Sequence, residues 1–143
     1  MKKVTDKIPA VVRVAFGLVF LVFGLLGLLR LLPQPELPDR GQVFMHALAY
    51  SGWLLPLLKT TEVVAGALLV AGLWAPFALV LLAPILVNIL AFHLFLAPNG
   101  LGMAIFLVGA EIYLAYVYRE AWKPLFARKA AKQTASSAHP TAA

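Results

Sequence analysis

The sequence contains no cysteine, and only 13% of its 143 residues are charged. The absence of cysteine excludes disulfide bonds, C-x-x-C redox motifs, cysteine-ligated iron–sulfur clusters and covalently attached c-type haem. The shortage of charge excludes more, because a soluble domain carries about 25% charged residues. Twelve Lys and Arg with six Asp and Glu cannot cover the surface of a water-soluble fold of this length. A soluble globular protein and a disordered one are therefore both excluded.

Hydrophobic residues make up 62% of the chain, enough for about four membrane-spanning helices of about 20 residues each. The stretch 63–92 contains no ionisable residue, and residues 72–76 predict a turn inside it. This stretch is too long for one span and too short for two, so the earlier span must begin near Trp53. Lys59 and Glu62 then lie in the membrane. The predicted spans are residues 10–32, 52–73, 77–97 and 101–118.

A three-span alternative leaves Lys59 and Glu62 in water, but it reduces residues 85–96 to a segment too short to cross. We therefore expect an all-α fold, a polytopic four-helix membrane bundle that forms one domain over residues 1–126. Residues 127–143 predict a basic, disordered tail. The basic N-terminus and first apolar run also suit a signal peptide, but no small-residue cleavage site follows them.

The segment between the first two spans is predicted to be a proline-rich loop followed by a short helix. Pro33, Pro35 and Pro38 force an extended chain. Residues 42–51 then alternate apolar and polar side chains as an amphipathic helix does. This helix is too short to span, and we expect it at the membrane interface or in the mouth of the bundle.

Basic residues flank the first span and follow the last, whereas few occupy the other side. Under the positive-inside rule this asymmetry predicts that both termini are cytoplasmic. The basic tail is then a topology signal and not a nucleic-acid footprint, which needs a structured basic surface. The nine residues on one side are Lys2, Lys3, Lys7, Arg13, Arg119, Lys123, Arg128, Lys129 and Lys132, against Arg30 and Arg40.

Six of the polar residues within the predicted spans need an explanation, because a charge inside the bilayer costs about 2.5–3.5 kcal/mol on insertion scales. We predict that they form a polar ligand-binding pocket, since charges inside a bilayer usually mark functional positions. The alternative is that Lys59 and Glu62 only form an intrahelical ion pair that lowers the cost of insertion. The candidate ligand-binding residues are Arg13, Lys59, Glu62, Asn88, His93 and Glu111.

Helical periodicity gives each of these residues a face and a depth. Arg13, Gly17, Gly24 and Gly27 follow one stripe, which predicts close approach of another helix. Glu62, Asn88 and Glu111 lie near the midplane at about 1.5 Å of rise per residue. Two carboxylates at one depth repel each other, so one should hold a proton or share a cation. Asn88 and His93 point about 140° apart, so they cannot face the same interior line.

The histidines predict no metal site. His46 and His93 lie on the same side of the membrane, so a metal or haem pair between them is geometrically conceivable. Two histidines without a spacing motif are weak evidence for such a pair. The other interpretation is that His93 reaches the interface or bonds a nearby carbonyl.

The sequence resembles the DoxX family of small four-helix bacterial membrane proteins over about residues 8–126. The matching stretches are residues 13–20 with Gly24 and Gly27, T-T-E-V-V-A-G at 60–66, residues 84–93, and Glu111 before Tyr113. The family is similar to the small membrane subunit of thiosulfate:quinone oxidoreductase. The resemblance implies a four-helix bundle in the bacterial inner membrane and a link to quinone-level redox chemistry, and it assigns no catalytic residues.

The leading hypothesis is a membrane subunit of a quinone-linked redox complex, with a quinone as the candidate cofactor in the polar pocket. Its expected partners are the lipid bilayer, a redox protein and a second copy in a homodimer, and an enzymatic role is limited to that of an accessory subunit. One alternative is an assembly partner without a ligand of its own. The other is a small proton-coupled transporter that uses its midplane carboxylates.

Overall fold

The computed structural model describes residues 7–33 and 36–126, and within them the chain is helical without strands. Four of its helices are long and apolar enough to cross a membrane: α2, α4, α5, and α6 together with the short η1. These observations confirm the all-α, four-helix fold class. The predicted tail at 127–143 lies outside the described residues. The elements are α2 (Ile8–Leu28), α3 (Asp39–Tyr50), α4 (Leu54–Ala71), α5 (Ala75–Phe95), η1 (Pro98–Gly100), α6 (Leu101–Val117) and α7 (Arg119–Phe126).

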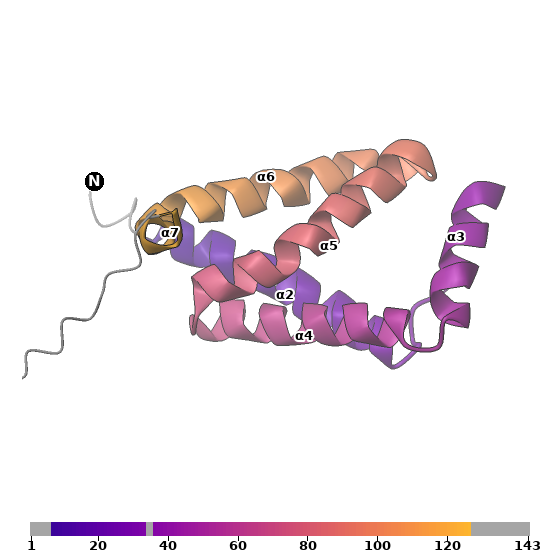
Figure 1. Cartoon of the computed structure of the whole chain (residues 1–143), viewed down its shortest axis with the longest axis horizontal. Coiled ribbons are helices and arrows are strands. Elements are labelled where there is room, and N and C mark those ends of the chain that lie inside the picture. The colour runs from indigo at the N-terminus through magenta and orange to yellow at the C-terminus, as the bar shows by residue number, and fades with distance from the viewer. Residues whose placement is uncertain (1–6, 34–35, 127–143) are drawn as a thin grey trace, which may run out of the picture.

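The four long helices run between two ends of the molecule (Figure 1). At one end lie the start of α2, the turn between α4 and α5, and α7; we call it the α7 end. At the other end α3 lies across the bundle, close to the turn between α5 and α6; we call it the α3 end. Helices α4 and α5 meet at residues 72–74 and diverge toward the α3 end. The space between their diverging parts is covered by α3.

Glycines bring α2 and α4 into close contact. A Cβ atom on Gly66 of α4 would lie 2.5 Å from the Leu21 backbone nitrogen and 2.7 Å from the Gly17 carbonyl oxygen of α2. A Cβ on Gly17 would lie 2.8 Å from the Leu69 Cβ. The predicted glycine stripe is therefore confirmed, and the helix that approaches it is α4. Such close packing of small residues is a main source of helix association in membranes.

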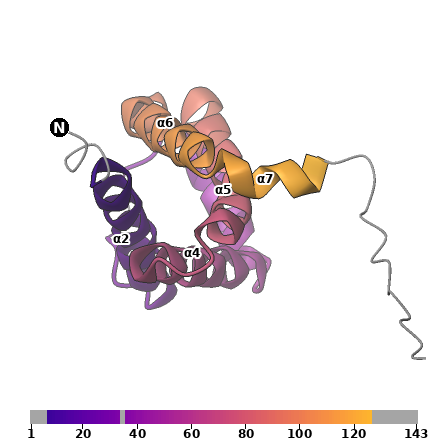
Figure 2. The ribbon, with the colours of Figure 1, turned by 90° about the vertical axis from the view of Figure 1, so that its left-hand side faces the viewer.

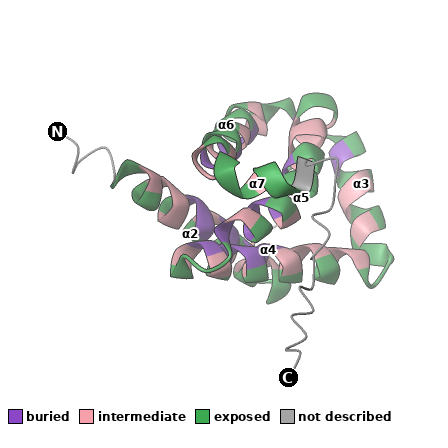
Figure 3. Cartoon of the chain, turned by 60° about the vertical axis from the view of Figure 1, so that its left-hand side comes forward, coloured by how far each residue is buried: buried purple, intermediate pink, exposed green. Residues whose placement is uncertain are grey.

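The buried core lies between the long helices, and most of their outer surface is apolar and exposed (Figure 3). A lipid-facing surface has this composition, because it meets hydrocarbon and not water. The exposed apolar residues include Phe23, Val80 and Phe106. The larger buried side chains are Phe16, Phe20, Leu69, Leu79, Leu82, Ile85, Leu86, Leu107 and Leu114.

The helix boundaries differ from the predicted ones by a few residues, and two of these differences have local reasons. Helix α2 ends at Leu28, four residues before the end of the predicted span 10–32. It ends there because Arg30 takes a left-handed conformation with φ 57°. The Leu31 backbone N–H donates to the Leu26 carbonyl there and closes the last turn. Helix α3 begins at Asp39, earlier than the predicted residue 42, directly after Pro38. The proline ring disfavours the helical conformation in the residue before it, so the helix cannot begin earlier in the chain.

Helix α7 was missed by the sequence analysis, which ended the last element at residue 118. The chain turns at Tyr118, and α7 then projects sideways from the bundle (Figure 2). The indole N–H of Trp122 donates to the Ala115 carbonyl of α6 at 2.9 Å, which ties α7 to the preceding span. With eight residues and an internal Pro124, this segment is too short to be predicted as a further span.

Candidate functional site

A half-open cavity of about 120 Å³ lies between α3, α4 and α5 toward the α3 end. This volume is smaller than the range of about 300–1,000 Å³ that is typical of small-molecule sites, so the cavity encloses only part of a ligand of that size. Eight of its twelve lining residues are apolar: Phe44, Met45, Leu48, Leu55, Leu58, Ile85, Ile89 and Phe92. The four polar ones are Lys59, Glu62, Asn88 and His93. An apolar cavity with a few polar groups is the usual composition of a ligand site.

On the α4 wall, Lys59 and Glu62 form an ion pair. The Lys59 ammonium donates to both carboxylate oxygens of Glu62, at 3.0 and 2.8 Å. The side chain of Glu62 is only 7% exposed and that of Lys59 is 22% exposed. We predicted that one of the midplane carboxylates either holds a proton or shares a cation. Glu62 shares the cation of Lys59. Because an ammonium has three N–H donors, one remains free to bond a ligand.

Helix α2 supports this ion pair from behind. A Cβ atom on Gly24 would lie 2.9 Å from the Glu62 Cβ, and one on Gly27 would lie 2.8 Å from the Lys59 Cδ. These two glycines therefore leave the space that the stems of Glu62 and Lys59 occupy. The glycine stripe thus serves the site as well as the helix packing, since it lets the ion pair lie between α2 and the cavity.

On the α5 wall, Asn88 and His93 stand at the two edges of one stripe. Ile85, Ile89 and Phe92 lie between them on the helical wheel, so the cavity-lining surface of α5 is about 140° wide. The predicted divergence of Asn88 and His93 therefore does not prevent both from lining the cavity, because it is open and broad. Asn88 is exposed and lies at the rim.

The ring of His93 is held at the end of α5. Its Nδ1 lies 3.0 Å from the Ala97 carbonyl oxygen, which can only accept, so Nδ1 donates. In the neutral ring, Nε2 is then an acceptor. The imidazole packs directly against Gly100, where it occupies the space a Cβ atom would need. The interpretation of His93 as a residue that bonds a nearby carbonyl is confirmed, and the same residue also lines the cavity.

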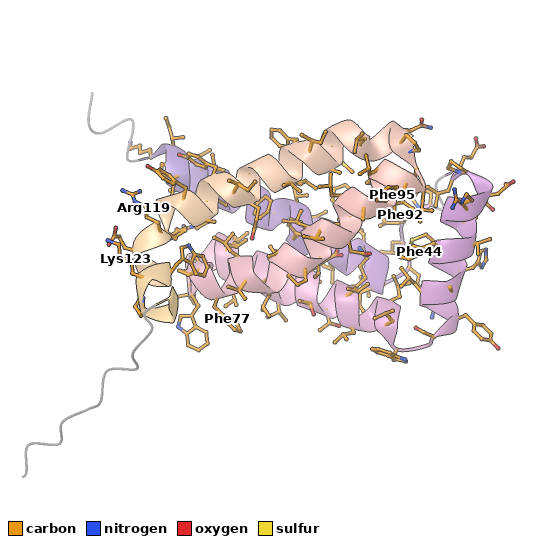
Figure 4. The ribbon with its side chains drawn as sticks, turned by 45° about the horizontal axis from the view of Figure 1, so that its top comes forward. Phe44, Phe77, Phe92, Phe95, Arg119 and Lys123 are labelled. Carbon is orange, nitrogen blue, oxygen red and sulfur yellow. The ribbon has the colours of Figure 1, made fainter. Side chains whose placement is uncertain are left out.

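Helix α3 covers the end of the cavity through aromatic contact with α5. The rings of Phe44 and Phe92 lie with centroids 5.6 Å apart, and Figure 4 shows them side by side between the two helices. Buried Gly41 lets the backbone of α3 approach Phe92 and the Leu96 carbonyl. The expectation that this helix lies at the interface or in the mouth of the bundle is confirmed, with α3 in the mouth. Its apolar face forms a wall of the cavity, which was not predicted from the sequence.

Two of the six candidate residues, Arg13 and Glu111, do not line this cavity. The guanidinium of Arg13 lies against Gly72 at the C-terminus of α4, which is the negative end of the helix dipole, and its buried Nε has no hydrogen-bond partner. Glu111 is buried in α6, and its Oε2 has no hydrogen-bond partner. The structure therefore brings together Lys59, Glu62, Asn88 and His93.

A metal centre finds no support in the described residues. His46 is exposed on α3 and is not among the residues that line the cavity with His93. Within residues 7–33 and 36–126, no group of three or more His, Asp or Glu side chains is arranged to hold a metal ion. The polar groups of the cavity instead suit hydrogen bonds to an organic ligand.

Comparison with known proteins identifies the family. The DoxX family model matches residues 8–95, more than half of the chain. This stretch contains α2 to α5 and every residue that lines the cavity. No curated protein and no solved structure matches the chain. With its four helices able to span a membrane, the chain belongs to the DoxX family of membrane proteins.

Proposed function

We propose that this protein is the membrane subunit of a quinone-linked redox complex and that it binds the quinone ring in the cavity between α3, α4 and α5. The carrying observation is that N–H donors of Lys59 and Asn88 stand on two walls of an otherwise mostly apolar cavity. A quinone is a flat apolar ring with two carbonyl oxygens that accept hydrogen bonds, so its chemistry is complementary to these walls.

The position of the cavity supports a ligand that is dissolved in the membrane. The cavity is bounded by two spans, α4 and α5, and by α3 at their end. Its aromatic wall, Phe44 and Phe92, offers faces and edges for ring contact. The chain would bind and orient the quinone, and a partner redox protein would supply the two electrons that, with two protons, convert it to quinol.

Binding of ubiquinone or menaquinone to the full chain in nanodiscs tests the proposal. We expect saturable binding that falls about tenfold in the Lys59→Met/Glu62→Gln variant, because a neutral amide donor replaces the stronger charged donor of Lys59 and no unpaired charge is left. The matched control is Lys123→Met/Glu120→Gln, which removes an exposed ion pair of the same spacing. Absence of saturable binding of either quinone, or an equal loss in the control, would contradict the proposal.

A second candidate is a non-catalytic assembly partner, in a complex or as a homodimer. It is favoured by the fact that Lys59 and Glu62 satisfy each other without any ligand. In that case the Lys59→Met/Glu62→Gln variant keeps full function in the assembled complex. Co-purification of the complex, together with its activity, separates this candidate from a quinone-binding subunit.

A third candidate is a small proton-coupled transporter. The observation in its favour is Glu111, a buried carboxyl group within α6 that has an oxygen without a hydrogen-bond partner. Intramembrane carboxyl groups of this kind often carry protons. Proton-dependent flux in liposomes that is abolished by Glu111→Gln would favour this function over quinone binding.

We place the protein in the bacterial inner membrane with the α7 end in the cytoplasm. The support is the distribution of basic residues, which flank the first span and follow the last. The resemblance to a small subunit of a quinone-linked oxidoreductase agrees with this location, since quinones reside in that membrane.

A further inference from the structure

Helix α7 leaves the bundle sideways, as an element lying along a membrane surface would. Figure 2 shows it projecting from the end of α6. Two contacts fix its start: the Trp122 indole bonds the Ala115 carbonyl, and the Arg119 guanidinium lies 4.7 Å from the centre of the Tyr116 ring. Its direction relative to the span is therefore set by the fold. A helix held at an angle to a span at its end lies near the headgroups.

One face of α7 presents two cations. Arg119 and Lys123 are four residues apart, so they share a face, and their side chains are 56% and 68% exposed. Figure 4 shows both side chains at this end of the molecule. Glu120 lies between them, 2.6 Å from the Lys123 ammonium and 3.9 Å from the Arg119 guanidinium. The helix keeps a net positive charge in spite of this carboxylate.

The rest of the α7 end adds to this charge, whereas the α3 end is balanced. Among the described residues, the α7 end carries four basic side chains against one acidic, and the α3 end carries two of each. The α7 end also exposes an aromatic pair at the turn between α4 and α5, Trp74 and Phe77, with ring centroids 6.3 Å apart. Aromatic residues beside basic ones are typical of the headgroup region.

We infer that α7 is an in-plane helix that binds anionic phospholipid headgroups through Arg119 and Lys123, with exposed Trp74 and Phe77 at the same membrane surface. The charge of the surface selects the ligand, because zwitterionic headgroups offer no net attraction to it. This site lies at the opposite end of the molecule from the cavity between α3, α4 and α5, so it is independent of quinone binding.

The test compares lipids that differ only in headgroup charge. The full chain, purified in detergent, is titrated with phosphatidylglycerol or phosphatidylcholine, and bound lipids are counted by native mass spectrometry. We expect phosphatidylglycerol to bind more tightly, and Arg119→Gln/Lys123→Gln to lose most of the difference, about fivefold for each cation removed. The control is Arg30→Gln/Arg40→Gln, which removes the same number of cations from the α3 end and should keep the preference.

A second variant guards against a simple folding defect. Glu120→Gln removes the only described acidic residue of the α7 end, and it should raise the affinity for phosphatidylglycerol. A damaged protein cannot produce this rise. The inference is overturned if Arg119→Gln/Lys123→Gln keeps the lipid preference, if the α3-end control loses it equally, or if Glu120→Gln causes no rise.

Discussion

At the scale of single residues, Lys59 and Glu62 are a buried ion pair with two supports. Each group gives the other its charge partner, and Gly24 and Gly27 of α2 make room for their stems. In the apolar surroundings of a span, such a pair costs far less than either charge alone. The pair can therefore persist in the membrane while one N–H of Lys59 stays available to the cavity.

Removing one partner should cost much more than removing both. Lys59→Met leaves the Glu62 carboxylate buried without its cation, and we expect it to lower the free energy of unfolding by about 3–5 kcal/mol. Lys59→Met/Glu62→Gln should recover most of that loss. Unfolding of the reconstituted protein by detergent titration measures both values.

The exposed pair Lys123–Glu120 is a control with the same spacing. Lys123→Met should change the free energy of unfolding by less than about 1 kcal/mol, because water screens both charges. If the single Lys59 variant were as stable as the double one, the ion pair would not be the reason that Glu62 is tolerated.

At the scale of elements, the contact between α2 and α4 depends on glycines, because a side chain at these positions would hold the two helices apart. Gly66 and Gly17 bring the two backbones together, whereas Gly109 on α6 faces open space. Glycine is therefore required for helix packing at Gly17 and Gly66, whereas packing does not require it at Gly109. Only the neighbouring helix distinguishes the two cases, since all three glycines lie within an apolar span.

Alanine at these two glycines should have opposite effects. Gly66→Ala places a Cβ against the backbone of α2, which cannot yield, so we expect a loss of about 1–3 kcal/mol or more in unfolding free energy. Gly109→Ala should be neutral or stabilise by about 0.5–1 kcal/mol, because alanine favours the helix. Unfolding titrations in one lipid mixture compare them, and equal losses would refute the assignment of the α2–α4 contact.

The attachment of α7 to α6 gives another prediction at this scale. Trp122→Phe keeps the apolar ring but removes the N–H that bonds the Ala115 carbonyl. We expect amide hydrogen exchange in α7 to rise about fivefold, as the loss of about 1 kcal/mol implies. Trp74→Phe is the control, because that indole is 75% exposed and lies outside α7. Unchanged exchange in Trp122→Phe would show that the bond does not hold α7.

At the scale of the whole molecule, two crosswise helices stand at opposite ends of four long ones. Helix α3 covers the cavity at one end, and α7 carries basic residues at the other (Figure 1). The ends therefore differ in charge, and our two proposals give them different functions: a ligand site at the α3 end and contact with a charged membrane surface at the α7 end. Under the positive-inside rule, this asymmetry predicts that the α7 end faces the cytoplasm.

The orientation can be tested directly. We expect a fluorescent protein fused after residue 143 to fold in the cytoplasm and fluoresce, and alkaline phosphatase inserted at residues 98–100 to be active outside it. The reason is the excess of basic residues around the first and last spans. An inactive phosphatase with a dark C-terminal fusion would reverse the topology. An active phosphatase with a dark C-terminal fusion, or an inactive one with a fluorescent fusion, would put both sites on the same side and contradict α6 as a span.

Much of the fold followed from composition and periodicity. The low content of charged residues predicted a membrane protein, and the lengths of the apolar stretches predicted four spans. The stripe with Gly17 and Gly24 predicted a close contact with another helix. Boundaries were less accurate, because the end of α2 depends on the left-handed Arg30 and on backbone bonds of the turn. Helix α7 was missed, since its position depends on one bond from Trp122 to a carbonyl seven residues earlier.

For the site, the sequence by itself determined which polar residues lie in the membrane and that Lys59 and Glu62 share a helical face, because both follow from rise and turn per residue. The tertiary structure decided which of them meet. Lys59, Glu62, Asn88 and His93 share a cavity because α4 and α5 diverge beneath α3, while Arg13 and Glu111 lie elsewhere. Helical periodicity assigns each residue an angle on its own helix, but only packing assigns the neighbour that it faces.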